Sequence, residues 1–208
     1  ILKDPSDPET FAQAMDAILH CPKYPLDKAK ALAIAFQETL DAKNLSEVQK
    51  DTLTVPNEKL SIGLISNAFS LNKHSSKFLS WFVGPKWSEA SLIGYQQSVR
   101  TDFITTSAMQ KCSNWREIFD LDDYTLELTI KGENLDVLVD LSNVNWKPKL
   151  NVLGAKPCAT RIGTFLLPEP GFAPGITHIL CDDVIVESTE DTLLPDQEKI
   201  VINGSIFS

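Results

Sequence analysis

The sequence predicts an α+β protein in which an N-terminal helical half packs with a C-terminal antiparallel β-sheet, as a single sheet or a sandwich-like pair. Two observations predict this class. The spacing of apolar residues changes from helical to alternating near residue 120. Beyond that point, short strand-like runs follow one another without helical segments between them, which is typical of antiparallel sheets.

The same change of period predicts the domain organisation. We expect a helical region over residues 1–118 and an antiparallel β region over residues 119–208, forming two units or one continuous α+β domain. With 208 residues, of which 43% are hydrophobic, the chain can build a substantial core.

Five helices are expected in the first half, the third of them short. Residues 6–9 supply an N-cap followed by proline at the first helical position, and an apolar stripe continues to about residue 19. A second helix runs from near Pro25 to about Lys43. A short third helix can start at Ser46-Glu47 and is broken at residues 55–57. Asn57 can cap a fourth helix, which carries Leu60, Leu64, Ile65, Ala68 and Phe69. A long helix starts at Ser88 and keeps one apolar face through Leu92, Tyr95, Val99, Phe103 and Met109.

The second half predicts strands. Apolar and polar residues alternate over residues 124–130 and again over 135–141, and residues 131–134 are suited to a turn, so we expect a β-hairpin. Three further strands are expected over residues 158–167, 176–188 and 198–207, the second of them as a strand or a tight hairpin.

Charge and hydropathy disfavour several classes of partner. The formal net charge of -9 and a pI near 4.8 disfavour nucleic acid and anionic membrane surfaces. No apolar run approaches the roughly 18 residues that a membrane span needs, and no signal peptide is visible in the chain. We therefore expect a soluble protein, in a compartment that the sequence does not specify.

Familiar catalytic motifs are absent from the sequence. It contains no P-loop, no GxGxxG, no GxSxG and no HExxH. The alternating βαβ pattern of a Rossmann unit is also not apparent. Its four cysteines are far apart and its three histidines are scattered, so we predict neither a metal site nor a cofactor.

One cluster could carry chemistry. The stretch from Ile176 to Ser188 gathers His178, Asp182 and Asp183, which are candidate catalytic residues. On an unbroken strand His178 and Asp182 would lie about 13 Å apart, so a shared site requires a turn or bulge at residues 181–183. An ordinary strand or hairpin is the favoured interpretation.

Aromatic residues offer a second kind of site. Trp87 and Trp146 fall near segment ends, and Phe172 lies in a proline-rich loop, so these three side chains are candidate binding residues. Packing at the edge of the core is the favoured alternative for them.

The prediction that fits these observations is a non-enzymatic interaction or assembly protein that acts through loops, sheet edges and exposed aromatics. Its partner would be another protein or a second copy of the chain. Two alternatives stay open: a hydrolase-type enzyme using His178 with Asp182 or Asp183, and a carbohydrate- or ligand-binding module that uses tryptophans. The sequence specifies neither the partner nor a substrate.

Overall fold

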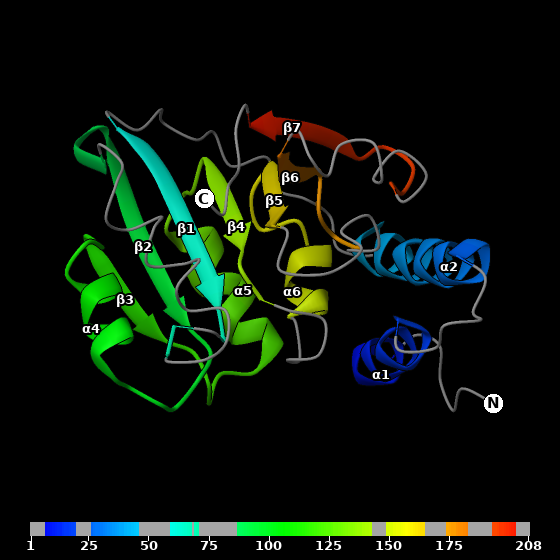
Figure 1. Ribbon diagram of the computed structural model, residues 1–208, viewed down its shortest axis with the longest axis horizontal. Helices are drawn as coiled ribbons and strands as arrows, with labels where there is room; N and C mark the ends of the chain where they lie inside the picture. The colour runs from blue at the N-terminus through cyan, green and yellow to red at the C-terminus, as the bar shows by residue number, and fades with distance from the viewer. Residues whose placement is uncertain are drawn as a thin grey trace.

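Seven parallel strands form one sheet at the centre of the computed structural model (Figure 1). The structure describes residues 7–19, 26–45, 59–67, 69–70, 87–142, 149–164, 174–182 and 193–202. The strands lie in the order β3-β2-β1-β4-β5-β6-β7, and every neighbouring pair is parallel. The sheet therefore extends from residue 60 to residue 202, across both halves of the sequence.

From β2 to β5, one helix lies in each connection between successive strands. The strands are β1 (Leu60–Ser66), β2 (Ala90–Gln96), β3 (Asn114–Glu117), β4 (Val137–Asp140), β5 (Thr160–Thr164), β6 (His178–Asp182) and β7 (Glu198–Ile202). The helices are α1 (Pro8–Leu19), α2 (Leu26–Leu45), α4 (Phe103–Met109), α5 (Asp123–Gly132) and α6 (Leu150–Gly154), with a 3₁₀ turn, η1, at Trp87–Glu89.

The two faces of the sheet are covered by different helices. On one face, α5 and α6 bury a cluster that includes Ile65, Tyr95, Leu126, Leu138 and Ile179. On the other face, α4 covers a smaller cluster that includes Leu64, Phe69, Leu92, Val139 and Leu141. Because helices cover both faces, the central strands are buried on both sides and are largely apolar, as parallel sheets require.

The prediction of an antiparallel sheet is wrong. Strands β4 to β7 lie where the sequence predicts strands, but each pairs in parallel with its neighbour. Parallel strands need a crossover between them, and α6 lies in the connection from β4 to β5. Its five residues are too few to give a periodic signal, so the connection reads as irregular in the sequence. The βαβ alternation that the motif analysis missed is therefore present.

The predicted hairpin is also wrong, because its first arm is α5. Asp122 caps this helix by accepting a hydrogen bond from Thr125 N at 2.7 Å. Leu126 and Ile130 are fully buried, whereas Tyr124 and Leu128 are 67% and 51% exposed. Only every fourth residue of the alternating run enters the core, so the true period is helical.

Two segments that the sequence predicts as helices contain strands instead. Residues 60–66, assigned to a helix, form β1, and the long helix from Ser88 divides into β2, a loop and α4. Short continuous apolar runs fit buried strands and helices equally well. The apolar face predicted for the long helix is not buried in the structure, because Val99 and Phe103 are 74% and 60% exposed.

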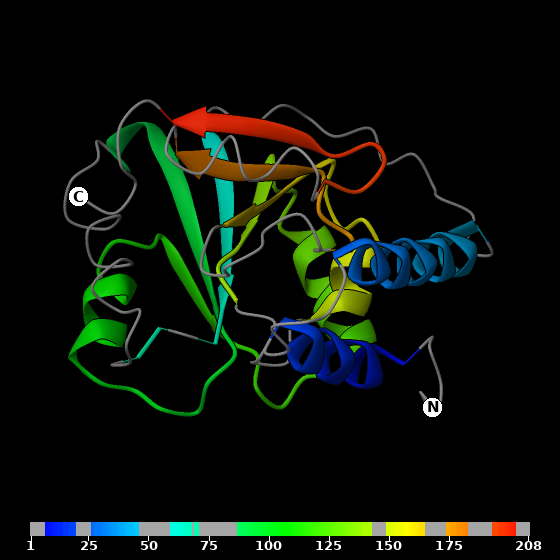
Figure 2. The ribbon, with the colours of Figure 1, turned by 45° about the vertical axis from the view of Figure 1, so that its right-hand side comes forward.

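The two N-terminal helices are confirmed. Asp7 caps α1, accepting hydrogen bonds from Thr10 N and Thr10 Oγ1 at 2.8 and 2.7 Å, and this pairing lowers the pKa of its carboxyl. Figures 1 and 2 show α1 and α2 together at the end of the molecule away from α4. Their shared cluster includes Phe11 and Phe36, whose rings stack at a centroid distance of 4.4 Å.

Among the residues that the structure describes, none of the helices has the length and apolar character that crossing a bilayer requires.

Gly94 allows the close contact between β2 and β3. A Cβ atom at this position would lie closer than 3.0 Å to the indole ring of Trp115. We expect Gly94→Ala to lower the free energy of unfolding by about 1–3 kcal/mol, because the ring would have to move in a packed core. Gly132→Ala is the matched control, since a Cβ atom added at Gly132 would have no neighbour within 4 Å. Urea unfolding of both variants measures the difference, and equal stabilities would contradict the prediction.

Candidate functional site

The order of the strands identifies where a ligand would bind. From β1 the chain proceeds to β2 and β3 on one side, and then returns to place β4 on the other side of β1. In open α/β sheets, ligands bind outside the carboxyl ends of the strands at the point where the order reverses. Here that point, called the switch point below, lies at Ser66 of β1 and Asp140 of β4.

Asp140 is the carboxylate at the switch point. Its register partners are Ile65 on β1 and Gly163 on β5, so it lies within the paired part of the sheet. Its Oδ1 atom accepts a hydrogen bond from Ser142 N at 2.8 Å, which fixes the orientation of the carboxyl. Burial raises the pKa of Asp140 to about 6, and the hydrogen bonds of Ser142 partly oppose this effect.

The end of β1 is tied to the segment that follows β2. Ser66 is fully buried, and its carbonyl accepts a hydrogen bond from Gln97 N at 2.8 Å. In the first turn of α4, Thr105 Oγ1 donates to the carbonyl of Phe69. These bonds hold the carboxyl ends of β1 and β2 together beside the switch point.

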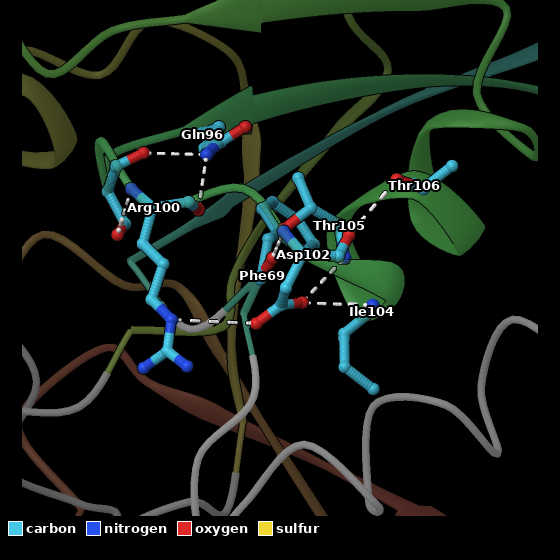
Figure 3. Close-up of polar contacts among 8 residues, drawn as sticks. Phe69, Gln96, Arg100, Asp102, Ile104, Thr105 and Thr106 are labelled. Carbon is cyan, nitrogen blue, oxygen red and sulfur yellow. Dashed lines mark hydrogen bonds and ion pairs between the residues drawn. The ribbon is translucent and has the colours of Figure 1, made fainter.

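The loop between β2 and α4 is organised by Gln96, a buried residue at the end of β2 (Figure 3). Its Nε2 atom donates to the carbonyls of Ser98 and Arg100 at 2.6 and 3.0 Å. Its Oε1 atom accepts a hydrogen bond from Trp115 Nε1 at 3.1 Å. The amide therefore uses both of its ends to fix the loop backbone against the sheet.

The loop ends at Asp102, which begins α4. The carboxylate accepts a hydrogen bond from Ile104 N at 2.9 Å, and Thr105 Oγ1 accepts one from Asp102 N at 3.1 Å, which completes a capping box. Arg100 lies beside it, with Nε 3.7 Å from Asp102 Oδ2, and its side chain is 62% exposed. The result is an exposed guanidinium on a fixed loop at the carboxyl edge of the sheet (Figure 3).

Other carboxylates at this edge have structural roles. Asp122 caps α5, and the hydrogen bonds of Thr125 lower its pKa. Asp123 binds Lys149 Nζ at 3.1 Å and Asn151 Nδ2 at 2.9 Å, which joins the start of α5 to α6. Asp140 differs from Asp122 because burial, rather than capping, governs its pKa.

The structure does not bring His178 and Asp182 together. His178 begins β6 and Asp182 ends it, and β6 is unbroken between them, pairing with β7 from His178↔Glu198 to Asp182↔Ile202. The two residues are therefore about 13 Å apart along the strand, at opposite edges of the sheet. His178 Nδ1 shares a hydrogen bond with Thr177 Oγ1 at 2.8 Å, and its Nε2 is 3.4 Å from Glu198 Oε2.

The remaining candidates from the sequence stay predictions. Asp183, Trp146 and Phe172 lie outside the described residues, and Trp87 is described only as part of η1, without its side chain. Within the described residues, no group of three or more His, Cys, Asp and Glu side chains is placed to hold a metal ion.

Sequence reasoning missed the residues at the switch point. A signal for them exists: each of three short apolar runs ends in polar residues. These are Ser66-Asn67 at the end of β1, Gln96-Gln97 at the end of β2 and Asp140 at the end of β4. Polar residues directly after buried parallel strands indicate a binding edge, but the pattern has this meaning only once the strands are recognised as parallel.

Similarity to known proteins is low in sequence and high in structure. No protein family model matches the chain. It is 20% identical over 155 residues to the probable UDP-N-acetylglucosamine--peptide N-acetylglucosaminyltransferase SPINDLY of Arabidopsis thaliana, covering 73% of this chain and 17% of that protein. It is 21% identical over 136 residues to the protein of the same name from Solanum lycopersicum, covering 64% of this chain and 15% of that protein.

A solved O-GlcNAc transferase has the same fold. The structure of a lysine-to-methionine mutant of the enzyme from Thermobaculum terrenum matches with a TM-score of 0.79 at 14% identity, over 95% of this chain and 38% of that chain. The prediction of a purely structural assembly protein is wrong on these comparisons, because the similar proteins are named as sugar-transferring enzymes. The chain spans less than a fifth of the curated relatives, and it shares its fold with part of a solved O-GlcNAc transferase.

Proposed function

We propose that this chain is a nucleotide-sugar-binding part of a glycosyltransferase that transfers a sugar to a peptide hydroxyl. The observation that carries the proposal is the parallel sheet, whose strand order matches a dinucleotide-type fold and whose carboxyl edge presents polar groups at the switch point. Likeness to an O-GlcNAc transferase structure and to proteins named as N-acetylglucosaminyltransferases supports the reaction class. The donor by this analogy is UDP-N-acetylglucosamine and the partner is a protein substrate.

The electrostatics of the edge favour a particular role for Arg100. The chain has a net charge of -9, which repels the diphosphate of a nucleotide sugar. Arg100 brings an exposed positive charge to the carboxyl edge, on a loop fixed by Gln96 and by the capping box of α4. A guanidinium pairs well with phosphate oxygens in a bidentate geometry. In this proposal, Arg100 contacts the diphosphate and Asp140 lies closer to the reacting end of the donor.

The proposed function is tested with the purified protein and donors labelled in the sugar. A panel of UDP-, GDP- and CMP-linked sugars is incubated with a library of serine- and threonine-containing peptides, and the label incorporated into peptide is measured. We expect transfer from UDP-N-acetylglucosamine above that from the other donors. Absence of transfer from every donor, together with absence of binding by calorimetry, would refute the proposed function.

Arg100→Ala is expected to weaken donor binding by about fivefold to tenfold, because an exposed contact between guanidinium and phosphate contributes on the order of 1 kcal/mol. Calorimetric titration with the nucleotide diphosphate measures the change. Lys59→Ala is the matched control, since this substitution removes one exposed positive charge just before β1, at the opposite edge of the sheet. Equal affinities of the two variants for the nucleotide diphosphate would contradict the proposal that Arg100 contacts the donor.

A further inference from the structure

We propose that Asp140 is the general base of the transfer reaction, accepting the proton of the acceptor hydroxyl. The inference rests on the proposed glycosyltransferase function and assigns a residue to its chemical step. It follows from the position, packing and surroundings of this one carboxylate.

The position of Asp140 is set by the sheet rather than by a loop. Its neighbours across the sheet are Ile65 and Gly163, and Leu141 N donates to the carbonyl of Ile65 at 2.9 Å immediately beyond it. The hydrogen bond from Ser142 N at 2.8 Å orients the carboxyl. A catalytic group held by a rigid element keeps its geometry better than one on a mobile loop.

Several charged groups at the carboxyl edge of the sheet have partners of their own. Neither strand neighbour of Asp140 ionises, because they are isoleucine and glycine. At the starts of α5 and α6, Asp122 caps a helix, while Asp123 and Lys149 pair with each other at 3.1 Å. Arg100 in the loop after β2 lies beside Asp102. Among the residues that the structure describes, Asp122 and Asp123 thus have structural roles at this edge, whereas Asp140 lies at the switch point itself.

Transfer of the sugar to the acceptor hydroxyl requires one group that accepts the proton of that hydroxyl. As the acceptor oxygen forms its bond to the anomeric carbon, its proton moves to the Asp140 carboxylate. The bond between the anomeric carbon and the phosphate oxygen breaks, and its electron pair leaves with the nucleoside diphosphate. Burial supports this role, because it raises the pKa of Asp140 to about 6, close to the pH at which a base must work while still being ionised.

The experiment compares Asp140→Asn, Asp140→Glu and Asp136→Asn in the peptide transfer assay. Asparagine keeps the size and hydrogen-bonding oxygen but accepts no proton, so we expect kcat to fall by about 10²–10⁴-fold with donor affinity within about twofold of the wild type. Asp140→Glu should recover part of the activity. Asp136 immediately precedes β4, at the opposite end of the strand, where its Oδ2 accepts a hydrogen bond from Ser61 N at 2.7 Å. Its asparagine variant should transfer normally.

The pH profile separates proton transfer from simple positioning. Wild-type kcat/KM should fall as pH drops through about 6, where Asp140 becomes protonated, and Asp140→Asn should lose this acid limb. A kcat within about fivefold of wild type, or a loss confined to donor affinity, would overturn the assignment. Failure of the wild type to bind or transfer any donor would instead refute the proposed function, and the role of Asp140 with it.

Discussion

Replacing Arg161 with methionine is expected to lower the free energy of unfolding by about 3 kcal/mol. Arg161 is 5% exposed, and its guanidinium donates to backbone carbonyls rather than to a carboxylate. Nε donates to Gly175 O at 2.5 Å, and one terminal nitrogen donates to Cys158 O and Ala159 O at 2.6 and 3.1 Å. Methionine keeps the aliphatic stem but leaves three partly or fully buried carbonyls without these donors, which costs about 1 kcal/mol or more for each.

Urea unfolding monitored by circular dichroism measures this loss. Arg161→Lys should give an intermediate stability, because its ammonium keeps the charge without the fork of guanidinium donors. Arg116→Met is the control: Arg116 is 46% exposed and pairs with Glu133, so its loss should cost under about 1 kcal/mol. If Arg161→Met and Arg116→Met were equally stable, the buried guanidinium would not be holding the segment from Gly175 onto β5.

Asp140→Asn is expected to stabilise the protein by about 2 kcal/mol at pH 7.5, even though it removes activity. In the folded state burial raises the pKa of Asp140 from 3.8 to about 6. The folded protein therefore binds this proton more tightly than the unfolded chain, so protonation favours folding. Stability falls as pH rises from about 4 to 6, and the full penalty of the buried charge is present above pH 6. A neutral amide avoids that penalty.

The pH dependence identifies the cause. Wild type and Asp140→Asn should have similar free energies of unfolding at pH 4, where the wild-type carboxyl is largely protonated in the folded state, and should diverge as pH rises. Asp136→Asn serves again as the control at the other end of β4. A variant that is less stable than wild type at pH 7.5 would show that the charge of Asp140 is compensated in the folded protein. The substitution is thus expected to raise stability and lower activity, as is common where an active site keeps a group that destabilises the fold.

Sequence reasoning predicted part of this fold, and the reasons for its errors are local. It identified α1 and α2, because their caps and apolar stripes are long and regular. It placed strands near β4 to β7, but the pattern that predicts a strand does not show whether the strand pairs in parallel or antiparallel with its neighbours. Parallel strands are connected by crossovers, and two of these are not recognisable in the sequence. Helix α6 is too short to show a helical period, and the apolar residues of α5 alternate as in a strand. The continuous apolar runs of β1 and β2 were assigned to helices, because a buried run of seven residues lacks a diagnostic period.

The candidate site could not be predicted without the topology. Asp140 and Gln96 are 44 residues apart in the sequence, and only the strand order brings the ends of β4 and β2 to one edge. The one residue-level inference that needed no topology concerned His178 and Asp182, whose separation follows from strand geometry alone, and β6 is indeed unbroken between them. Their catalytic role stays a prediction.

The separate core of α1 and α2 has a consequence for how the protein opens. Among the described residues, their cluster includes Leu150 of α6 and Leu194 from outside the helical pair, and it shares no buried residue with the two clusters on the sheet. Gln37 Oε1, which accepts a hydrogen bond from Gly175 N at 2.7 Å, and Asp41, which pairs with Lys156 at 2.9 Å, add polar links. Detaching the helical pair therefore exposes one small apolar cluster and leaves the sheet intact. We expect such an event to require less free energy than global unfolding, so that the helical pair opens as a cooperative unit of its own.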